Sequence, residues 1–505
     1  MTCRVEASRD DETCDGTRGS ALESPFFVYS LMLKGDELTL VIDSLSGDGK
    51  SVARQDGMVI FVSPHVGGEN ALPGDTVRVK LWKIRKNFAE ARPVEIVSPS
   101  PMRVAPKCRH FGTCGGCRWQ DLSYEAQLRF KRQFVVDAFR RIGGFGDPDV
   151  GPVVACEDPY FYRNKMEFTF ANRRWLSTEE MGRSEEIRPE VALGLHVPER
   201  YDKVLNVEEC WLQSEIAAAI VNTVREIARV WNLSVYSTQT HTGYLRHLVI
   251  REGKRTGELM VNLVTTTDWP EAMGNMAELL VKQFPTITTI VNNITDRKSM
   301  VAFGEKEKIY HGEGTITEKL GGYTFRISAN SFFQTNTLQA ERLYGVARQC
   351  AELKSDDVVY DLYSGTGTIA IFLSDAVERV IGIELSQSAI EDAGRNAEIN
   401  RVSNCYFLQG DLKDRLTKDS AWLEEHPRPT VVVADPPRSG MHPKVIEKIC
   451  RTSPGRIVYV SCNPSTQARD ARLFAEAGYR LGGVQPVDMF PHTDHVEAVA
   501  VLRKG

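Results

Sequence analysis

From Asp356 to the C-terminus, apolar strand-like runs alternate with segments of helical character. A glycine-rich turn joins DDVVYDLY to TIAIFLSDA, and a second strand–helix pair reads VERVIGIELS and AIEDAGRNAEINR. Three further strand-like runs follow, namely CYFLQGD, TVVVADPP and RIVYVSC. Alternation of this kind requires a largely parallel sheet with helices on both faces. The sequence therefore predicts a doubly wound, Rossmann-like α/β domain, which we place at residues 326–505.

The preceding residues divide into three segments. Short strand-like runs fill residues 35–98, and the glycine and Pro-Gly breaks between them predict a small β-barrel of the OB type. Residues 99–325 mix strands with helices expected at 124–143 and 214–230, and we assign them to one α+β central domain. Residues 1–34 contain scattered acids, which argue against an export signal, and we expect a disordered tail there.

Composition limits the possible functions. The 505-residue chain has a formal net charge of −5, so it is not a basic nucleic-acid binder as a whole, although basic residues outnumber acids between Arg78 and Arg92. It lacks a run of roughly 18 apolar residues, so we expect no membrane association and a cytoplasmic location. Its eleven cysteines, an odd number, predict metal or catalytic roles rather than a disulfide framework.

A glycine turn after the first strand of the C-terminal domain is a candidate cofactor site. The turn reads DLYSGTGT, from Asp361 to Thr368, and its glycines permit close approach of a ligand to the backbone. Glu384, at the end of the next strand, is placed to accept hydrogen bonds from ribose hydroxyls, and Asp411 ends the third strand, where it can reach an adenine amino group. No Gly-Lys-Ser/Thr follows, so a P-loop is excluded, but the turn alone does not exclude NAD.

Two strand ends and one later segment carry reactive side chains. These are Asp435 in DPPR, Cys462 in SCNP and Glu497 in PHTDHVE. Methylation of uracil at C5 needs a thiolate to add to C6 and a base to remove the C5 proton. Cys462 and Glu497 are of those two types, and Arg438 can stabilise the charge on the enolate oxygen. The sequence therefore favours an enzyme that methylates C5 of a pyrimidine.

Other interpretations stay open at this point. A cysteine at a strand end is more often a small buried hydrophobic residue, and we read Cys350, Cys405 and Cys450 in that way. Asp-Pro-Pro also occurs in amino-methyltransferases, but Arg438 replaces the aromatic residue that such enzymes use to stack the base. A non-catalytic RNA-binding protein is a further alternative, and it would be expected to have lost one of the motifs.

A second group of cysteines has the spacing of a metal site. Cys108, Cys114 and Cys117 form a C-x₅-C-x₂-C array, which is rarely core filler. A fourth ligand is missing locally, and Cys156 and Cys210 are the candidates. Four thiolates would suit either zinc or an iron–sulfur cluster.

The C-terminal motifs resemble those of the RNA uracil-C5 methyltransferases. The matching motifs are SFFQTN, DLYSGTGTIA, DPPRSG, VYVSCNP and PHTDHVEAVAVL, in that order between about Phe332 and Val501. The resemblance implies Cys462 as nucleophile, Glu497 as base and S-adenosylmethionine as methyl donor. It implies cofactor contacts from Gln334, Tyr363, Gly365, Thr368, Glu384, Asp411 and Asp435. Ser364 departs from the family, which usually has cysteine there, with little expected consequence.

The N-terminal segments resemble the members that act on 23S rRNA. CRHFGTCGGC followed by VLNVEECWL looks like their [4Fe–4S] site, which implies ligation by Cys108, Cys114, Cys117 and Cys210 and leaves Cys156 free. DSLSGDGKSVAR and LPGDTV look like parts of a TRAM domain, a small RNA-binding barrel. We therefore expect an RNA substrate, 23S rRNA first and tRNA as the alternative, and no obligate protein partner.

Overall fold

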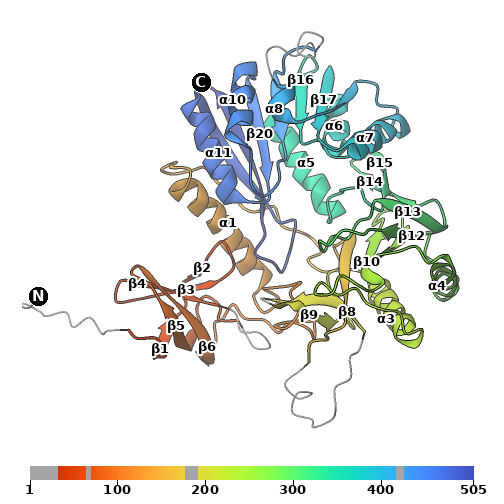
Figure 1. The fold of residues 1–505 in the computed structure, drawn as a ribbon. Helices are drawn as coiled ribbons and strands as arrows, with labels where there is room; N and C mark the ends of the chain where they lie inside the picture. Colours follow the sequence, from red (N-terminus) through yellow and green to blue (C-terminus); the bar gives the residue numbers. More distant parts are fainter. Residues whose placement is uncertain (1–31, 64–69, 177–190, 199, 417–425) are drawn as a thin grey trace, which may run out of the picture.

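The structure is a computed structural model that describes residues 32–63, 70–176, 191–198, 200–416 and 426–505. A small β unit, a central α+β part and a C-terminal α/β part follow one another along the chain (Figure 1). Except for residues 32–34, the predicted N-terminal tail lies outside the described residues.

The N-terminal unit is a six-stranded sheet with its own apolar core. Its strands are β1 (Glu37–Val41), β2 (Ser44–Leu45), β3 (Ser51–Gln55), β4 (Met58–Val62), β5 (Thr76–Ile84) and β6 (Phe88–Ser98), in the order β1-β5-β6-β4-β3-β2. Strands β4 and β6 pair in parallel, and the other pairs are antiparallel. Alternate residues such as Leu40, Ile60, Val77 and Val79 point into the core, as expected for strands buried on one face. The predicted short strands are present as one sheet, whereas the barrel and its assignment as a TRAM domain stay predictions.

The central part is built on a seven-stranded sheet. Its strands are β7 (Lys165–Ala171), β8 (Ala192–Val197), β9 (Arg200–Asn206), β10 (Leu245–Glu252), β11 (Leu259–Thr265), β12 (Thr289–Ile294) and β13 (Lys306–His311), in the order β13-β12-β11-β10-β7-β8-β9. Helices α3 (Glu215–Val230) and α4 (Pro270–Gln283) pack on one face through Val221, Val224, Met276 and Leu280. The expected helix at 214–230 is therefore confirmed.

The C-terminal part is a doubly wound α/β domain. Its sheet has the order β18-β17-β16-β19-β20-β22-β21, in which β22 is antiparallel to both of its neighbours and the strands from β18 to β20 are parallel. The strands are β16 (Val358–Leu362), β17 (Arg379–Glu384), β18 (Cys405–Gln409), β19 (Val431–Ala434), β20 (Arg456–Ser461), β21 (Tyr479–Val487) and β22 (Glu497–Lys504). Helices α5 (Thr337–Ala351), α6 (Thr368–Leu373) and α7 (Gln387–Ile399) and helices α8 (Leu412–Arg415), α10 (Pro443–Thr452) and α11 (Pro464–Glu476) accompany them. The predicted Rossmann-like architecture is confirmed. Strand order reverses between β16 and β19, where open α/β sheets bind ligands.

Two elements that precede residue 326 belong to the core of this domain. Helix α1 (Tyr124–Arg141) matches the helix expected at 124–143, but its residues Val135 and Phe139 pack with α11 and β21. The hairpin of β14 (Thr315–Leu320) and β15 (Tyr323–Ser328) packs its apolar side under α5 and α6. Helices cover both faces of the C-terminal sheet. Helix α1 forms part of one of these layers, and its apolar face is buried there against α11 and β21.

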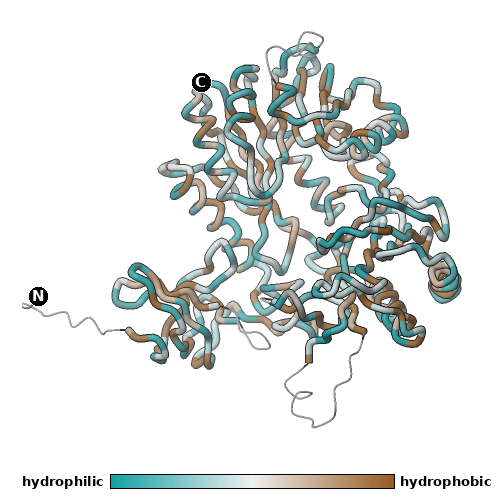
Figure 2. The backbone as a smooth tube through the Cα atoms, viewed as in Figure 1, coloured by the Kyte–Doolittle hydropathy of each residue, from teal (hydrophilic) through white to brown (hydrophobic). Residues whose placement is uncertain are grey.

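Among the described residues, no helix is long and apolar enough to cross a membrane. Hydrophilic and hydrophobic residues alternate along the helices instead (Figure 2). That pattern is typical of helices that cover a core on one side and face water on the other.

Candidate active site

A cavity of about 960 Å³ opens at the carboxyl edge of the C-terminal sheet. Residues from the ends of β16, β17, β19 and β20 and from the start of β22 line it, together with the segment 328–335. The predicted residues that line it are Gln334, Tyr363, Gly365, Glu384, Asp411, Asp435, Cys462 and Glu497. The structure therefore brings together all the predicted cofactor and catalytic residues except Thr368.

The glycine turn between β16 and α6 gives the cavity an open backbone wall. Gly365 and Gly367 have φ angles of 53° and 76°, in the left-handed region that glycine adopts without strain. A Cβ atom on Gly367 would lie 2.8 Å from the Phe407 ring, so the turn packs closely there, whereas a Cβ on Gly365 would meet nothing within 4 Å. The backbone at Gly365 is therefore accessible to a ligand from the cavity.

Glu384 is held across this turn by three backbone amides. The N–H groups of Gly365, Leu385 and Ser386 donate to its carboxylate at 3.1, 2.8 and 2.9 Å. Its orientation is thus fixed before any ligand arrives. Asp411 caps α8 by accepting a hydrogen bond from the N–H of Lys413 at 2.8 Å, which also fixes its carboxylate at the cavity wall.

Thr368 occupies a different place from the other predicted residues. It is the first residue of α6, it is buried, and its hydroxyl lies 3.1 Å from the Tyr344 hydroxyl. Side chains at the start of a helix lean back over the preceding turn, and this one leans toward α5. The motif located the turn correctly but did not show which way this side chain points.

Cys462 and Glu497 meet because their strands pair. Strands β20 and β22 are antiparallel with Ser461 opposite Ala498, so the next residues beyond this pair, Cys462 and Glu497, emerge side by side at the sheet edge. Asp435 follows β19, the other neighbour of β20, and its carboxylate lies 3.5 Å from the Gln334 side-chain nitrogen. A thiol and two carboxyl groups therefore share one end of the cavity.

Burial and mutual repulsion disturb the protonation of these groups. Burial, then the charge of Glu497, raise the pKa of Cys462 to about 11, while Arg438 acts in the opposite direction. Burial raises the pKa of Asp435 to about 7. Burial, then the charge of Asp435, hold the pKa of Glu497 well above its usual range. Carboxyl groups this close do not ionise together easily, so the ligand-free site retains protons at neutral pH.

Three cavity residues had no role in the sequence-based interpretation. His495 lies with its Nδ1 atom 3.3 Å from the Arg438 guanidinium, and Phe332 and Phe490 add aromatic surface, Phe332 at 65% exposure. Phe332 lies in the motif SFFQTN, His495 lies in PHTDHVE, and Phe490 directly precedes the latter. Their position in or beside these motifs is the sequence feature that could have identified them.

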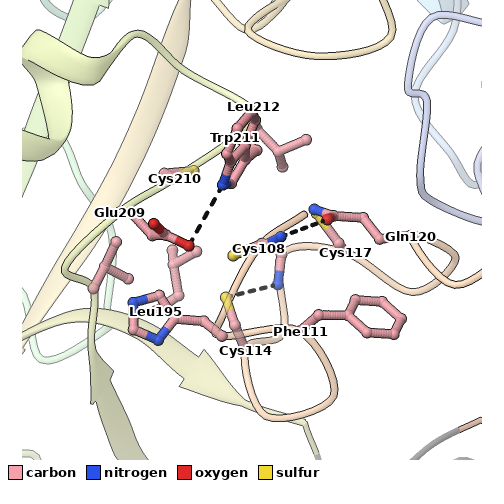
Figure 3. A pocket seen from close by; sticks show the side chains of 13 residues that line it. Cys108, Phe111, Cys114, Cys117, Gln120, Leu195, Glu209, Cys210, Trp211 and Leu212 are labelled. Atoms are coloured by element: carbon pink, nitrogen blue, oxygen red, sulfur yellow. Dashed lines mark hydrogen bonds between the residues drawn. The ribbon is translucent and has the colours of Figure 1, made fainter. Parts of the chain in front are cut away.

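The cysteine array lines a different pocket from this cavity. Cys108, Cys114, Cys117 and Cys210 line one small apolar pocket with about 360 Å³ of empty space, together with Phe111, Leu195, Val207, Trp211 and Leu212 (Figure 3). The Gly116 N–H lies 3.4 Å from the Cys114 sulfur, and the Gln120 amide donates to the Cys117 sulfur at 3.3 Å. Cys156 is buried elsewhere, beside Asp158 and Asn336.

Three of these thiols, those of Cys108, Cys114 and Cys117, have a raised pKa and are unfavourable to ionise as they stand. Burial chiefly raises the pKa of Cys108 to about 11 and of Cys114 to about 12, and the neighbouring Cys210 adds to both effects. Within the described ranges, no group of three or more His, Cys, Asp or Glu side chains has the arrangement of a metal-ion site.

Comparisons with known proteins address the chemistry of the site. A sequence model described as tRNA (uracil-5-)-methyltransferase matches residues 256–505. A Chlorobaculum tepidum protein named an uncharacterized RNA methyltransferase is 44% identical over 475 residues, which are 94% of this chain and 97% of that protein. A Bacteroides thetaiotaomicron protein of the same description is 42% identical over 461 residues, 91% of this chain and 99% of its own length. The chain belongs to the RNA uracil-C5 methyltransferase family.

The architecture of this methyltransferase is also found in a solved structure. The tRNA (uracil-54, C5)-methyltransferase of Pyrococcus abyssi, solved in complex with S-adenosyl-L-homocysteine, superposes with a TM-score of 0.69 at 30% identity. The match covers 92% of this chain and 100% of the archaeal chain.

Proposed function

We propose that this methyltransferase transfers a methyl group from S-adenosylmethionine to C5 of a uridine in RNA, through a covalent bond between Cys462 and C6. The observation that carries the proposal is that Cys462 and Glu497 lie next to one strand pair, Ser461 and Ala498, and line the cavity that also holds Glu384 and the glycine turn. The relative solved with S-adenosyl-L-homocysteine supports the choice of donor.

The residues of the cavity fit the donor. The fixed Glu384 carboxylate suits two ribose hydroxyls, Asp411 suits the adenine amino group, and the open backbone at Gly365 leaves room between them. Gln334, Tyr363 and Asp435 line the way from there to Cys462, and Thr368 supports the turn from behind. When bound, S-adenosylmethionine supplies an electrophilic methyl group on its sulfonium.

Glu384→Gln should weaken binding of the product S-adenosyl-L-homocysteine by about tenfold to a hundredfold, because hydrogen bonds to a charged group are replaced by weaker ones. Isothermal titration calorimetry measures the effect directly. Glu391→Gln, an exposed carboxylate on the neighbouring helix α7, is the matched control and should bind as the wild type does. Unchanged affinity in Glu384→Gln would remove this residue from the donor site.

The chain's own residues account for the steps on the base. The Cys462 thiolate adds to C6, and the electron pair of the C5–C6 double bond moves toward the O4 carbonyl, where Arg438 can stabilise the negative charge. C5 then becomes nucleophilic enough to take the methyl group. Glu497 removes the C5 proton, the double bond re-forms, and the Cys462 thiolate is expelled.

The raised pKa of Cys462 predicts a pH dependence. Below the pKa the thiolate fraction increases about tenfold for each pH unit, so kcat/KM should rise by about that factor per unit between pH 7 and 9. Ionisation of Glu497 changes in the same direction, since its pKa is also raised. Initial rates at low RNA concentration across this range test the prediction, and a flat profile would show that the thiolate already exists in the free enzyme.

We propose 23S rRNA as the substrate because the cysteine array and the N-terminal β unit resemble those of rRNA-directed members. The basic strand β5, with Arg85 and Lys86 at its turn into β6, suits contacts with phosphates. The archaeal tRNA enzyme favours tRNA as a second candidate, because it matches this chain along nearly its full length.

Mass-spectrometric mapping of 5-methyluridine in 23S rRNA and tRNA, from cells with and without this gene, tests the function and chooses between the substrates. We expect one uridine site to lose its methyl group in the deletion strain and to regain it with the wild-type gene. Identical 5-methyluridine maps in the two strains would contradict the proposal.

We further propose that the four cysteines hold a [4Fe–4S] cluster. The donor chemistry suits a cluster: four thiols line one apolar pocket, and two N–H groups point at the sulfurs, as suits charged thiolates, although as they stand the four thiols do not have the arrangement of a metal-ion site. Partial burial raises the pKa of Cys108 and of Cys114, so their thiolates are unfavourable without a cation nearby. Bound to these cysteines, a cluster would tie the 108–117 loop to the segment before α3.

Anaerobically purified protein should therefore absorb near 400 nm and contain about four iron atoms per chain. Cys210→Ser should abolish most of the absorbance, whereas Cys156→Ser should retain it, since Cys156 lies outside the pocket. Stoichiometric zinc without iron would identify a different site.

A further inference from the structure

The segment 488–496 joins β21 to β22 and leads directly into Glu497. It also supplies Phe490 and His495 to the active-site cavity. The segment is therefore continuous with the residue that carries the Glu497 carboxylate, and it shares the active-site cavity with it. We call residues 488–496 the base loop.

A buried ion pair from α1 anchors the beginning of the base loop. The ammonium group of Lys131 donates to the Asp488 carboxylate at 2.6 Å and to the Phe490 carbonyl at 2.9 Å, and both charged side chains are 0% exposed. Tyr124 lies about two turns earlier on the same face of α1, and its hydroxyl donates to the second oxygen of Asp488 at 2.9 Å. A fully buried charge without its partner is costly, so this pair fixes the position of the loop strongly.

A buried glutamine from the same helix holds the middle of the loop. The side-chain oxygen of Gln127 accepts a hydrogen bond from the His492 N–H at 2.8 Å, and its amide lies 3.2 Å from the His492 ring. His492 has a φ angle of 64°, which strains a residue with a Cβ atom. The Tyr160 ring stacks on it at 4.3 Å, and the N–H groups of Arg118 and Trp119 donate to its carbonyl. The strained conformation is thus held by contacts from outside the C-terminal domain's own sequence.

We propose that Lys131 and Gln127 are positioning residues for the general base Glu497. Neither side chain lines the active-site cavity, so their effect on the reaction would pass through the base loop. The proposal rests on the proposed function, in which Glu497 removes the C5 proton from the methylated covalent adduct. A base displaced by about 1 Å would slow proton removal much more than substrate binding.

This role has a signature that lost stability does not produce. If Glu497 is misplaced, Cys462 still adds to C6 and the methyl group still transfers, but the methylated adduct breaks down slowly. The covalent enzyme–RNA species then accumulates during turnover. A variant that is only partly folded would lose adduct and turnover in the same proportion.

The test uses Lys131→Met and Gln127→Met, which keep side-chain length but remove the polar contacts. Arg103→Met is the matched control, because Arg103 likewise pairs with a fully buried carboxylate, that of Asp75 beside the N-terminal unit. Each variant is assayed with an unmodified transcript of 23S rRNA, or of tRNA if that is the transcript methylated. The readouts are kcat, KM, thermal unfolding and the fraction of enzyme in a denaturation-resistant RNA adduct.

We expect kcat to fall about tenfold to a hundredfold in both loop-contact variants, with KM for RNA within about twofold of wild type. The adduct fraction should rise several-fold. Arg103→Met should lower the unfolding temperature while its adduct fraction stays at the wild-type value. If Lys131→Met does not fold, Gln127→Met alone tests the positioning role. We expect that variant to fold, because it leaves no buried charge unpaired.

Two outcomes would overturn the proposal, and they are distinguishable. A fall in kcat without adduct accumulation, while Glu497→Gln does accumulate adduct, would show that α1 only stabilises the fold. Absence of adduct in Glu497→Gln as well would reject the covalent mechanism and the positioning role together.

Discussion

Cys462→Ala should abolish methyl transfer to RNA, with a loss of at least about 10³-fold in kcat. Without the sulfur there is nothing to add to C6, and C5 of uracil is too weak a nucleophile to react unaided. RNA binding should be nearly unchanged, since one small half-buried side chain contributes little to a large, charged interface. Transfer of a labelled methyl group and a filter-binding assay measure the two effects on one preparation.

Cys450→Ala is the matched control for this substitution. Cys450 is also half-buried and close in sequence, but it lies on α10 and does not line the cavity. It should retain nearly full activity. Full activity in Cys462→Ala instead would mean that the methyl acceptor needs no covalent activation, which would favour an amino-methyltransferase.

Glu497→Gln should reduce turnover by about 10²- to 10⁴-fold while the covalent enzyme–RNA adduct accumulates. Glutamine fills the same buried space but cannot accept the C5 proton, so the reaction halts after methyl transfer. Replacing the carboxyl also removes the negative charge that raises the pKa of Cys462, so adduct formation itself should not be slower. Denaturing gel electrophoresis with labelled RNA detects the adduct as a band of reduced mobility.

Asp75→Asn serves as the control for changing a buried carboxyl group. Asp75 is 0% exposed and accepts a hydrogen bond from Arg103, so its replacement should lower the stability of the fold. Asp75 does not line the cavity. It should give neither adduct accumulation nor a loss of kcat beyond its loss of folded protein. Turnover of Glu497→Gln at the wild-type rate would show that another group removes the C5 proton.

Eight of the residues predicted from the sequence line one cavity because the fold brings together the ends of its strands. Cys462, Asp435 and Glu384 each follow or end an apolar run, and parallel strands place such ends at one edge of a sheet. The direction in which a side chain points was harder to predict from the sequence. Thr368 shares the motif with Gly365, yet it points toward Tyr344, because the first turn of α6 sets its orientation.

The assignment of α1 to the central domain shows a different limit. An amphipathic pattern reveals that Val135 and Phe139 need a cover, but it does not identify the partner. That partner, α11 with β21, lies more than three hundred residues further along the chain. The charged residue Lys131 within the helix was equally uninformative alone, because its counter-ion Asp488 is just as distant.

The long-range packing of α1 has a consequence for synthesis of the chain. This helix leaves the ribosome early, and its apolar face has no cover until α11 and β21 have been made. Contacts so far apart in sequence form slowly, because a large loop must close first. The catalytic half is therefore not a self-contained module that can be cut out at residue 326. Its core is complete only when β21, near the C-terminus, packs against α1, which is synthesised early.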